Sequence, residues 1–361
     1  MGRRREKEKC NRARGDRTAC RAERSALGGR RVFSRAEPDW RRMGRPEQME
    51  VLAMSAQAYR ENIDVQAAEL LQGAIDMHVH ANPHVSPENH MADAVDLARA
   101  ARDAGMKAMV IKDVTFPTTN TAYLVNKSVS GFRVFGSIVM NLVCGGINPR
   151  AVKVAVNHGD GAKVVYFPTG DTLHHVIARE RITYTGVNLP VTREQAISVV
   201  KNGNLTPETI EVLQIIADAD VCMVTGHLSP EETLTLVPRA IDIGVRRIIV
   251  LHTMWQMIGF TAEHIRELKK YDVMFEFEFG LCLPIMQFIH SEPTVDPRRM
   301  LQTMREIGVE KCIMTTDTGQ AYAPSPAATM KYFIAVLLKC GARKEEIERM
   351  VRRNPAQLLN L

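Results

Sequence analysis

Short apolar runs alternate with helical patterns from residue 74 to the end of the chain. An apolar run bounded by turn residues is typical of a buried strand, and runs without polar alternation favour a parallel sheet covered on both faces. The predicted strands are 74–81, 108–115, 133–141, 162–169, 221–228, 247–253, 273–280 and 311–318. The segments between them have the spacing of amphipathic helices, and two of these, 91–105 and 230–244, end at a glycine.

This alternation predicts a (β/α)8 TIM-like barrel, because eight strand–helix units in about 290 residues is the count that such a barrel requires. A doubly wound open sheet is the alternative, but it would not place polar residues at the ends of so many strands. An insertion, 171–220, contains an Asn202-Gly203 turn between two extended pieces, which predicts a hairpin that we interpret as a flap over the barrel mouth. A terminal helix, 344–353, is expected to close the chain.

The beginning of the chain does not follow this repeat. Residues 1–45 are rich in arginine and lack apolar periodicity, so we expect a disordered leader. A helical segment, 46–72, then precedes the barrel domain, 73–361. The leader could be a nucleic-acid or organelle-targeting arm, although its acidic residues are unusual in a transit peptide. The favoured interpretation is a dispensable leader, or an early start codon with Met43 or Met49 as the true start.

Composition narrows the class of protein. The net charge is +6, but residues 1–47 hold sixteen Lys and Arg against seven Asp and Glu, so the remaining chain carries −3 and does not resemble a nucleic-acid-binding domain. No apolar run reaches the roughly 18 residues needed to span a membrane. The seven cysteines are scattered without a C-x-x-C pair, which favours reduced thiols and a cytoplasmic location.

Residues that bind metals gather at the predicted strand ends, where barrels of this type build their active sites. His78 and His80 end the first strand, and their spacing places both imidazoles on one face together with Asp76. The other candidates are Lys112 on the second strand, Asp171 and His174 after the fourth, His227 on the fifth, His252 on the sixth and Asp317 on the eighth. Imidazoles beside carboxylates suit a divalent metal ion better than they suit a hydrophobic core.

This ordered set resembles the amidohydrolase superfamily of metal-dependent hydrolases. The resemblance covers residues 73–361 and rests on His-x-His on the first strand, one histidine each on the fifth and sixth, an aspartate on the eighth and the ending N-P-A-Q-L-L-N-L. The segments T-G-H-L-S-P-E-E, P-T-G-D-T-L-H and D-T-G-Q are similar to an uncharacterised amidohydrolase-like bacterial family. The resemblance implies an enzyme that uses a metal-activated water to cleave an amide, lactone or ester bond of a small polar or anionic substrate.

The resemblance also implies roles for individual residues. His78, His80, His227 and Asp317 are expected to bind the ion, and Asp317 is expected to transfer the proton of the attacking water as well. His252 is left for catalysis or for substrate. Zinc is the expected ion, and manganese or iron would also suit histidine and carboxylate ligands.

The chain departs from the superfamily pattern on the fourth strand. Binuclear members usually carry a carboxylated lysine or a glutamate there, whereas Lys163 lies at the start of this strand, away from the site. One ion is therefore favoured over two, with a carboxylated Lys112 as the alternative bridging ligand. Otherwise Lys112, Asp171 and His174 are predicted to bind substrate.

Four further side chains are given lesser roles. Glu276 and Glu278 share one face of the seventh strand. Glu276 lies early in that strand and is expected to pair with an Arg or Lys inside the barrel, so that only Glu278 could reach the site. His84 and His90 are interpreted as loop residues, although His84 could line the pocket.

Other functions remain open at this level. A metal-dependent decarboxylase on the same barrel and a metal-binding barrel without turnover both fit the pattern. A phosphoesterase that begins with His-x-His is disfavoured, since such enzymes end with Asp-x-His and here Asp317 is followed by Thr318-Gly319. Because barrels of this class often associate, a homo-oligomer is compatible with the sequence.

Overall fold

The computed structural model describes residues 55, 58, 62–84, 90–180, 191–285, 287 and 292–361, which belong to one compact unit, Ser55–Leu361. The predicted leader, 1–45, lies outside these residues. Of the predicted helical segment 46–72, the part from 62 to 71 is helical, and most of its beginning also lies outside the described ranges.

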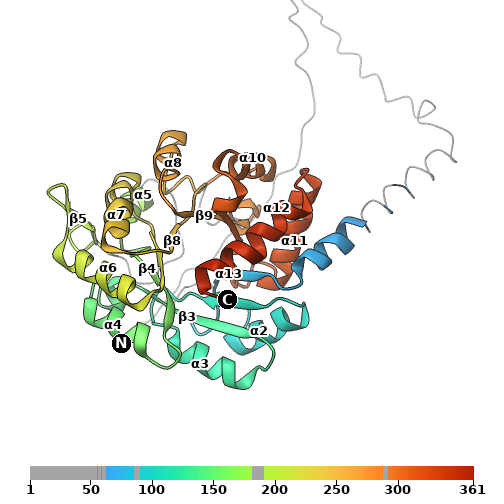
Figure 1. The fold of residues 1–361 in the computed structure, drawn as a ribbon, viewed down its shortest axis with the longest axis horizontal. Helices are drawn as coiled ribbons and strands as arrows, with labels where there is room; N and C mark the ends of the chain where they lie inside the picture. The colour runs from blue at the N-terminus through green and yellow to red at the C-terminus, as the bar shows by residue number, and fades with distance from the viewer. Residues whose placement is uncertain are drawn as a thin grey trace, which may run out of the picture. The chain divides into compact units, whose positions relative to one another are not determined.

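Eight parallel strands form the main sheet and follow one another in chain order (Figure 1). They are β1 (Ile75–Val79), β2 (Ala108–Ile111), β3 (Arg133–Val139), β4 (Ala162–Tyr166), β7 (Cys222–Val224), β8 (Ile248–Val250), β9 (Met274–Glu278) and β10 (Cys312–Thr315). Each of them lies within one of the eight predicted runs.

The two edge strands of the sheet meet and close the barrel. Backbone hydrogen bonds run from His80 N to the Thr318 carbonyl, at 2.9 Å, and from Asp317 N to the His78 carbonyl, at 3.0 Å. The predicted (β/α)8 barrel is therefore confirmed, and the open sheet is excluded. Closure also brings the first and last strand ends together, although more than 230 residues separate them along the chain.

Helices cover the outside of the barrel between successive strands (Figure 1). They are α2 (Ala94–Asp103), α3 (Thr119–Ser128), α4 (Pro149–Asn157), α5 (Leu173–Arg179), α6 (Pro207–Ala219), α7 (Pro230–Ile243), α8 (Ala262–Leu268), α10 (Pro297–Ile307) and α11 (Pro326–Lys339). The chain ends in α12 (Lys344–Glu348), a π-helical turn (Arg349–Arg353) and α13 (Asn354–Leu359), so the predicted terminal helix is longer than expected.

Local sequence signals explain where α7 begins and ends. The Ser229 side chain accepts a hydrogen bond from Glu232 N, and the Glu232 carboxylate accepts one from Ser229 N, which completes a capping box. Gly244 follows its last turn with φ of 108°, a conformation that costs glycine little. The predicted glycine stop is confirmed here.

The core has two layers. Strand residues such as Val110, Val164, Val224 and Ile313 form a cluster inside the barrel. A larger cluster lies between the strands and the helices and includes residues of both. On β9 the two phenylalanines face the helical layer, so Glu276 and Glu278 face the barrel interior.

The insertion contains the predicted hairpin. Strands β5 (Val200–Lys201) and β6 (Asn204–Leu205) pair antiparallel about Asn202 and Gly203, which have φ of 53° and 78°. Val199 N donates to the Glu232 carboxylate on α7, so the hairpin is attached to the helical layer. A role as a flap over the mouth stays a prediction.

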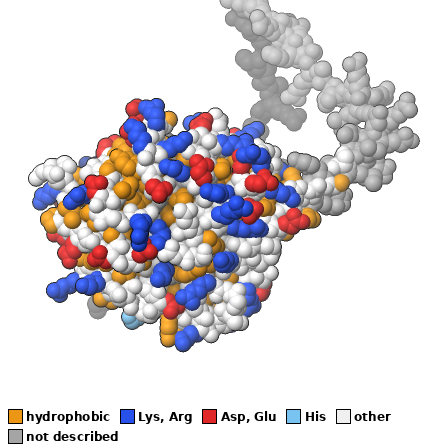
Figure 2. Space-filling view, viewed as in Figure 1, with side chains coloured by type: hydrophobic (Ala, Val, Ile, Leu, Met, Phe, Trp, Pro, Cys, Tyr) orange, Lys and Arg blue, Asp and Glu red, His pale blue; other side chains and the backbone are white. Residues whose placement is uncertain are grey.

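The surface carries both signs of charge. Lys and Arg side chains are interspersed with Asp and Glu on the face shown in Figure 2. Among the described residues, no helix is long and apolar enough to cross a membrane. The five cysteines in this part of the chain are free thiols.

Candidate metal centre

Three side chains from the two ends of the sheet converge at the carboxyl end of the barrel. His78 and His80 approach the same oxygen of Asp317: the Nε2 atoms lie 2.9 and 3.1 Å from Oδ1. One donor atom from each of the three side chains lies within 4.8 Å of the others, which is a separation suited to a metal ion. The structure therefore brings together three of the four predicted ligands.

Hydrogen bonds to the buried Asp76 side chain fix the backbone around these residues. Asp76, fully buried, accepts hydrogen bonds from His78 N and from both the backbone and the hydroxyl of Thr316. These contacts tie β1 to the segment that carries Asp317. Asp317 itself has φ of 50°, which is uncommon for a residue other than glycine and persists where the surroundings enforce it.

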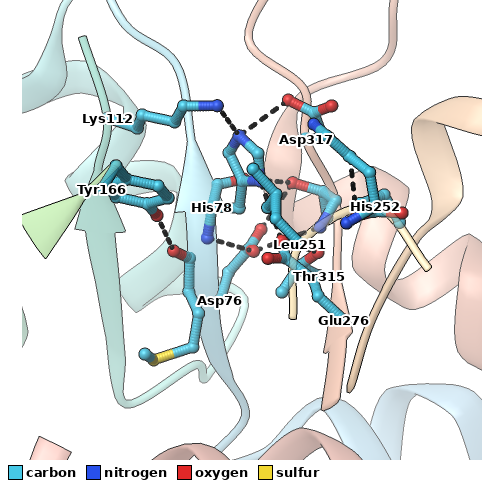
Figure 3. A network of polar contacts seen from close by, with 12 residues as sticks. Asp76, His78, Lys112, Tyr166, Leu251, His252, Glu276, Thr315 and Asp317 are labelled. Atoms are coloured by element: carbon cyan, nitrogen blue, oxygen red, sulfur yellow. Dashed lines mark hydrogen bonds and ion pairs between the residues drawn. The ribbon is translucent and has the colours of Figure 1, made fainter. Parts of the chain in front are cut away.

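Glu276 orients His78. Its Oε1 lies 2.8 Å from His78 Nδ1 and also accepts from the Thr315 hydroxyl (Figure 3). If Nδ1 donates to this carboxylate, Nε2 has a lone pair that faces the Asp317 oxygen. A cation must lie between two such acceptors.

A proton, a metal ion or the ammonium of Lys112, whose Nζ lies 3.0 Å from Nε2, can meet this need. Burial by itself lowers the pKa of His78, but the Asp317 and Glu276 carboxylates together outweigh it and raise that pKa to about 9. Burial also opposes ionisation of Asp317, and the His78 imidazole holds its pKa well below the usual range. Burial lowers the pKa of His80 to about 4, so this ring is neutral and available as a ligand. The donor set thus fits a divalent ion.

Lys112 completes one side of the group. Its Nζ lies 3.0 Å from His78 Nε2 and 5.2 Å from the centre of the Tyr166 ring, and the residue is only 3% exposed (Figure 3). Burial lowers its pKa. Lys112 is therefore a constituent of the site and does not extend from the strand end to solvent. Lys163, by contrast, lines a cavity of about 350 Å³ together with Arg133 and the C-terminal Leu361.

His252 is oriented in the same way as His78. Glu278 Oε1 lies 2.8 Å from His252 Nδ1 and accepts from the His252 backbone N–H at 2.9 Å. His252 has φ of 53°, so a second site residue adopts the left-handed conformation. Burial lowers its pKa to about 3, which keeps the ring neutral. If Nδ1 donates to Glu278, Nε2 carries the lone pair and can accept a hydrogen bond.

His227 lies beside His252, with ring centres 5.0 Å apart, but outside the group formed by His78, His80 and Asp317. Its Nδ1 is 2.8 Å from His175 Nδ1, and the two rings stack with centres 4.9 Å apart. Its Nε2 is buried and has no hydrogen-bond partner in the part of the chain that the structure describes. Trp255 packs edge-on against both His227 and His252. A role of His227 as a fourth ligand stays a prediction.

The contacts of the two other candidate substrate residues are with the protein itself. His174 Nε2 lies 3.0 Å from the Met257 carbonyl and 3.1 Å from that of Ile258. Asp171 accepts a hydrogen bond from Leu142 N at 2.7 Å, and burial raises its pKa. These contacts hold loops around the barrel mouth in place, and substrate binding by either side chain stays a prediction.

Two contributions were not predicted from the sequence. Among the described residues, Glu276 has His78 and Thr315 as its hydrogen-bond partners in place of the expected arginine or lysine, because the barrel closure places β1 beside β10 and within reach of β9. His175 contacts the site histidine instead of His174. The helix α5 begins at Leu173, so adjacent residues point in different directions. The alternation of F-E-F-E-F was the available signal for both glutamates.

A family model described as "Family of unknown function (DUF6282)" matches residues 73–276. A comparison with curated proteins found no match. Solved structures resemble this one over most of the barrel. The "probable dipeptidase PvdM" from Pseudomonas aeruginosa is 11% identical, with a TM-score of 0.55, over 83% of this chain and 98% of the other.

Two other solved structures have a TM-score of 0.50. A Xaa-Pro dipeptidase with bound methionine in its active site is 16% identical over 80% of this chain and 75% of the other. A mutated organophosphorus hydrolase from Deinococcus radiodurans is 15% identical over 81% and 94%. The structural neighbours are amidohydrolase-superfamily members, so the resemblance drawn from the strand-end residues is confirmed at the level of the fold.

Proposed function

The chain belongs to the family of unknown function DUF6282, and we propose that it is a metal-dependent hydrolase that cleaves an amide, lactone or ester bond of a small polar or anionic substrate. The observation that carries this proposal is the convergence of His78, His80 and Asp317, with the first of these oriented by Glu276. A histidine held by a carboxylate behind it is the arrangement that orients metal ligands in proteins.

His78, His80 and Asp317 would hold one divalent ion, with His227 as the proposed fourth ligand. Zinc suits this set of nitrogen and oxygen donors, as would manganese or iron. When bound, such an ion lowers the pKa of a coordinated water towards about 7 and so supplies hydroxide at neutral pH.

The protein's own residues would manage the protons. Asp317, whose carboxylate is kept ionised by its neighbours, accepts the proton of the attacking water and returns it to the leaving group. His252 is neutral, and its Nε2 would accept a hydrogen bond from the attacking water and so orient it. Lys112 would attract an anionic group of the substrate. Its burial makes such an ion pair stronger than on the surface.

The names of the similar structures support hydrolysis as the reaction class, since two are dipeptidases and one is an organophosphorus hydrolase. They do not select among amide, lactone and ester bonds. The Lys112 ammonium beside the ligand group favours an anionic substrate within that range.

The test combines metal analysis with activity. Purified full-length protein is expected to contain Zn²⁺ or a similar ion and to hydrolyse at least one member of a panel of dipeptides, N-acyl amino acids and lactones. Chelation should abolish turnover, and Asp317→Asn should reduce kcat by about 100-fold or more, as for the loss of a general base. Asp160→Asn, at an exposed ion pair with Arg133, is the control. A wild-type protein that neither contains nor takes up a metal ion would refute the proposal.

A further inference from the structure

A second group of histidines adjoins the site, on the loop that follows β1. His80, His84 and His90 each offer a ring nitrogen, and the three atoms lie within 4.8 Å of one another. The rings of His84 and His90 are 4.3 Å apart, and each lies about 6 Å from that of His80. Three imidazoles at this separation match the ligand number of a transition-metal site.

Hydrogen bonds hold the backbone at Asn82 and at His90–Met91. Asn82 N donates to the Ala92 carbonyl at 2.9 Å, and the Asn82 side chain donates to the His90 carbonyl at 2.8 Å. Met91 N donates to the Gly319 carbonyl at 2.8 Å, which ties the loop to the segment after β10. The backbone at these positions is therefore held in place by contacts within the protein.

A carboxylate lies within reach of the same group. Asp113 Oδ1 is 3.9 Å from His84 Nε2, and it is oriented by hydrogen bonds from both the backbone and the hydroxyl of Thr115. His80 and His90 are 7% and 6% exposed. An oriented carboxylate beside nearly buried imidazoles is a set of donors that suits Zn²⁺, Fe²⁺ or Mn²⁺.

His80 connects the two groups. Its Nε2 lies 3.1 Å from Asp317, while its Nδ1 is buried and has no hydrogen-bond partner among the residues that the structure describes. We propose that His80, His84 and His90 form a second divalent-metal site next to the first, with Asp113 as an additional ligand. This inference rests on the proposed function only in that His80 also belongs to the first site.

The alternative is that the three rings merely pack against one another. The number of metal ions bound per chain distinguishes a second metal site from simple packing of the rings. Full-length protein is equilibrated with excess Zn²⁺, gel-filtered and analysed by mass spectrometry of the metal, and the same samples are titrated with Co²⁺ and followed by visible absorption. The variants are His84→Ala/His90→Ala, the milder single changes His84→Gln and His90→Gln, and His78→Ala, which removes a ligand of the first site. His158→Ala is the control, at an exposed histidine whose ring contacts Asn120.

We expect two ions in the wild type and in His158→Ala, and one ion in His84→Ala/His90→Ala. The single glutamine variants should bind the second ion about 100-fold more weakly. Loss of a residue that only orients a metal ligand already lowers the affinity by up to about 100-fold, and these variants remove a ligand itself. They also cover the case in which the double variant fails to fold. The Co²⁺ absorption of the second ion should disappear in parallel.

Two results would overturn the inference. One is a second ion that persists in all the His84 and His90 variants, which would place it elsewhere. The other is a single ion in the wild type that is lost in His78→Ala and unaffected at His84 and His90, in which case the proposed function would survive alone. Absence of any ion from the wild type would refute both proposals together.

Discussion

The Nδ1 atom of His78 lies 2.8 Å from the Oε1 atom of Glu276, on the side of the ring away from Asp317 (Figure 3). Both side chains are essentially inaccessible to solvent. This pair fixes the ring of His78, and it selects which nitrogen faces Asp317.

Replacing Glu276 by glutamine should therefore weaken metal binding without removing a ligand. The neutral amide orients the ring less strongly and no longer increases the basicity of Nε2, so we expect the affinity for Zn²⁺ to fall about 10- to 100-fold. Competition with a chromophoric chelator measures this change. Glu267→Gln, at an exposed glutamate paired with Lys270, should have no effect. Equal affinities of Glu276→Gln and the wild type would show that the pair is only structural.

Lys112→Met should distinguish substrate binding from metal binding. The methionine fills most of the same space but lacks the ammonium, so we expect the ion to be retained and KM for an anionic substrate to rise about 10-fold or more, with a smaller change in kcat. A charge-assisted hydrogen bond is worth roughly this much. Lys163→Met, at the opposite end of the barrel, is the matched control. If Lys112→Met instead loses an ion, Lys112 is the carboxylated ligand.

Gly319→Ala tests the close approach of the loops. At Gly319, where φ is 141°, an added Cβ would lie 1.9 Å from the His80 carbonyl oxygen. We expect a loss of about 2–4 kcal/mol in the free energy of unfolding, measured in urea, together with weaker metal binding. At Gly203, φ is 78° and nothing lies within 4 Å of an added Cβ, so Gly203→Ala measures the cost of a left-handed backbone without a clash, about 1–2 kcal/mol. Equal losses in the two variants would contradict the steric argument.

The pH dependence of stability should contain a contribution from Glu346. Its hydrogen bonds with Arg305, the largest cause, and with Arg343 lower its pKa to about 2. A depressed carboxyl pKa adds stability above the ordinary value of 4.5, and that stability is lost as pH falls through about 2. Glu346→Gln should therefore cost about 1 kcal/mol at pH 7, because both arginines are largely exposed and screened.

Thermal unfolding between pH 2 and pH 7 checks this expectation. The difference between wild type and Glu346→Gln should shrink as the pH is lowered, and it should nearly vanish at the acid end. Glu345→Gln serves as the control, since that residue is exposed on the same helix, α12. A difference that does not vary with pH would mean that Glu346 stabilises the protein through packing alone.

The eight strands and the His-x-His pair could be predicted from the sequence because both depend on short-range periodicity. A run of apolar residues marks a buried strand wherever it occurs, and a spacing of two places His78 and His80 on one side of it. The order of the strand-end residues then predicted which ones meet, since parallel strands in a barrel all end at the same face.

Tertiary structure alone decided which polar atoms pair. The contacts between His80 and Asp317, and between His78 and Glu276, join residues 237 and 198 positions apart, and they exist because the barrel closes between β1 and β10. The choice of His175 over His174 depends on where α5 begins. The grouping of His80 with His84 and His90 depends on the hydrogen bond from Met91 N to the Gly319 carbonyl. No local pattern encodes these relationships, because each depends on how distant backbones approach one another once the core has packed.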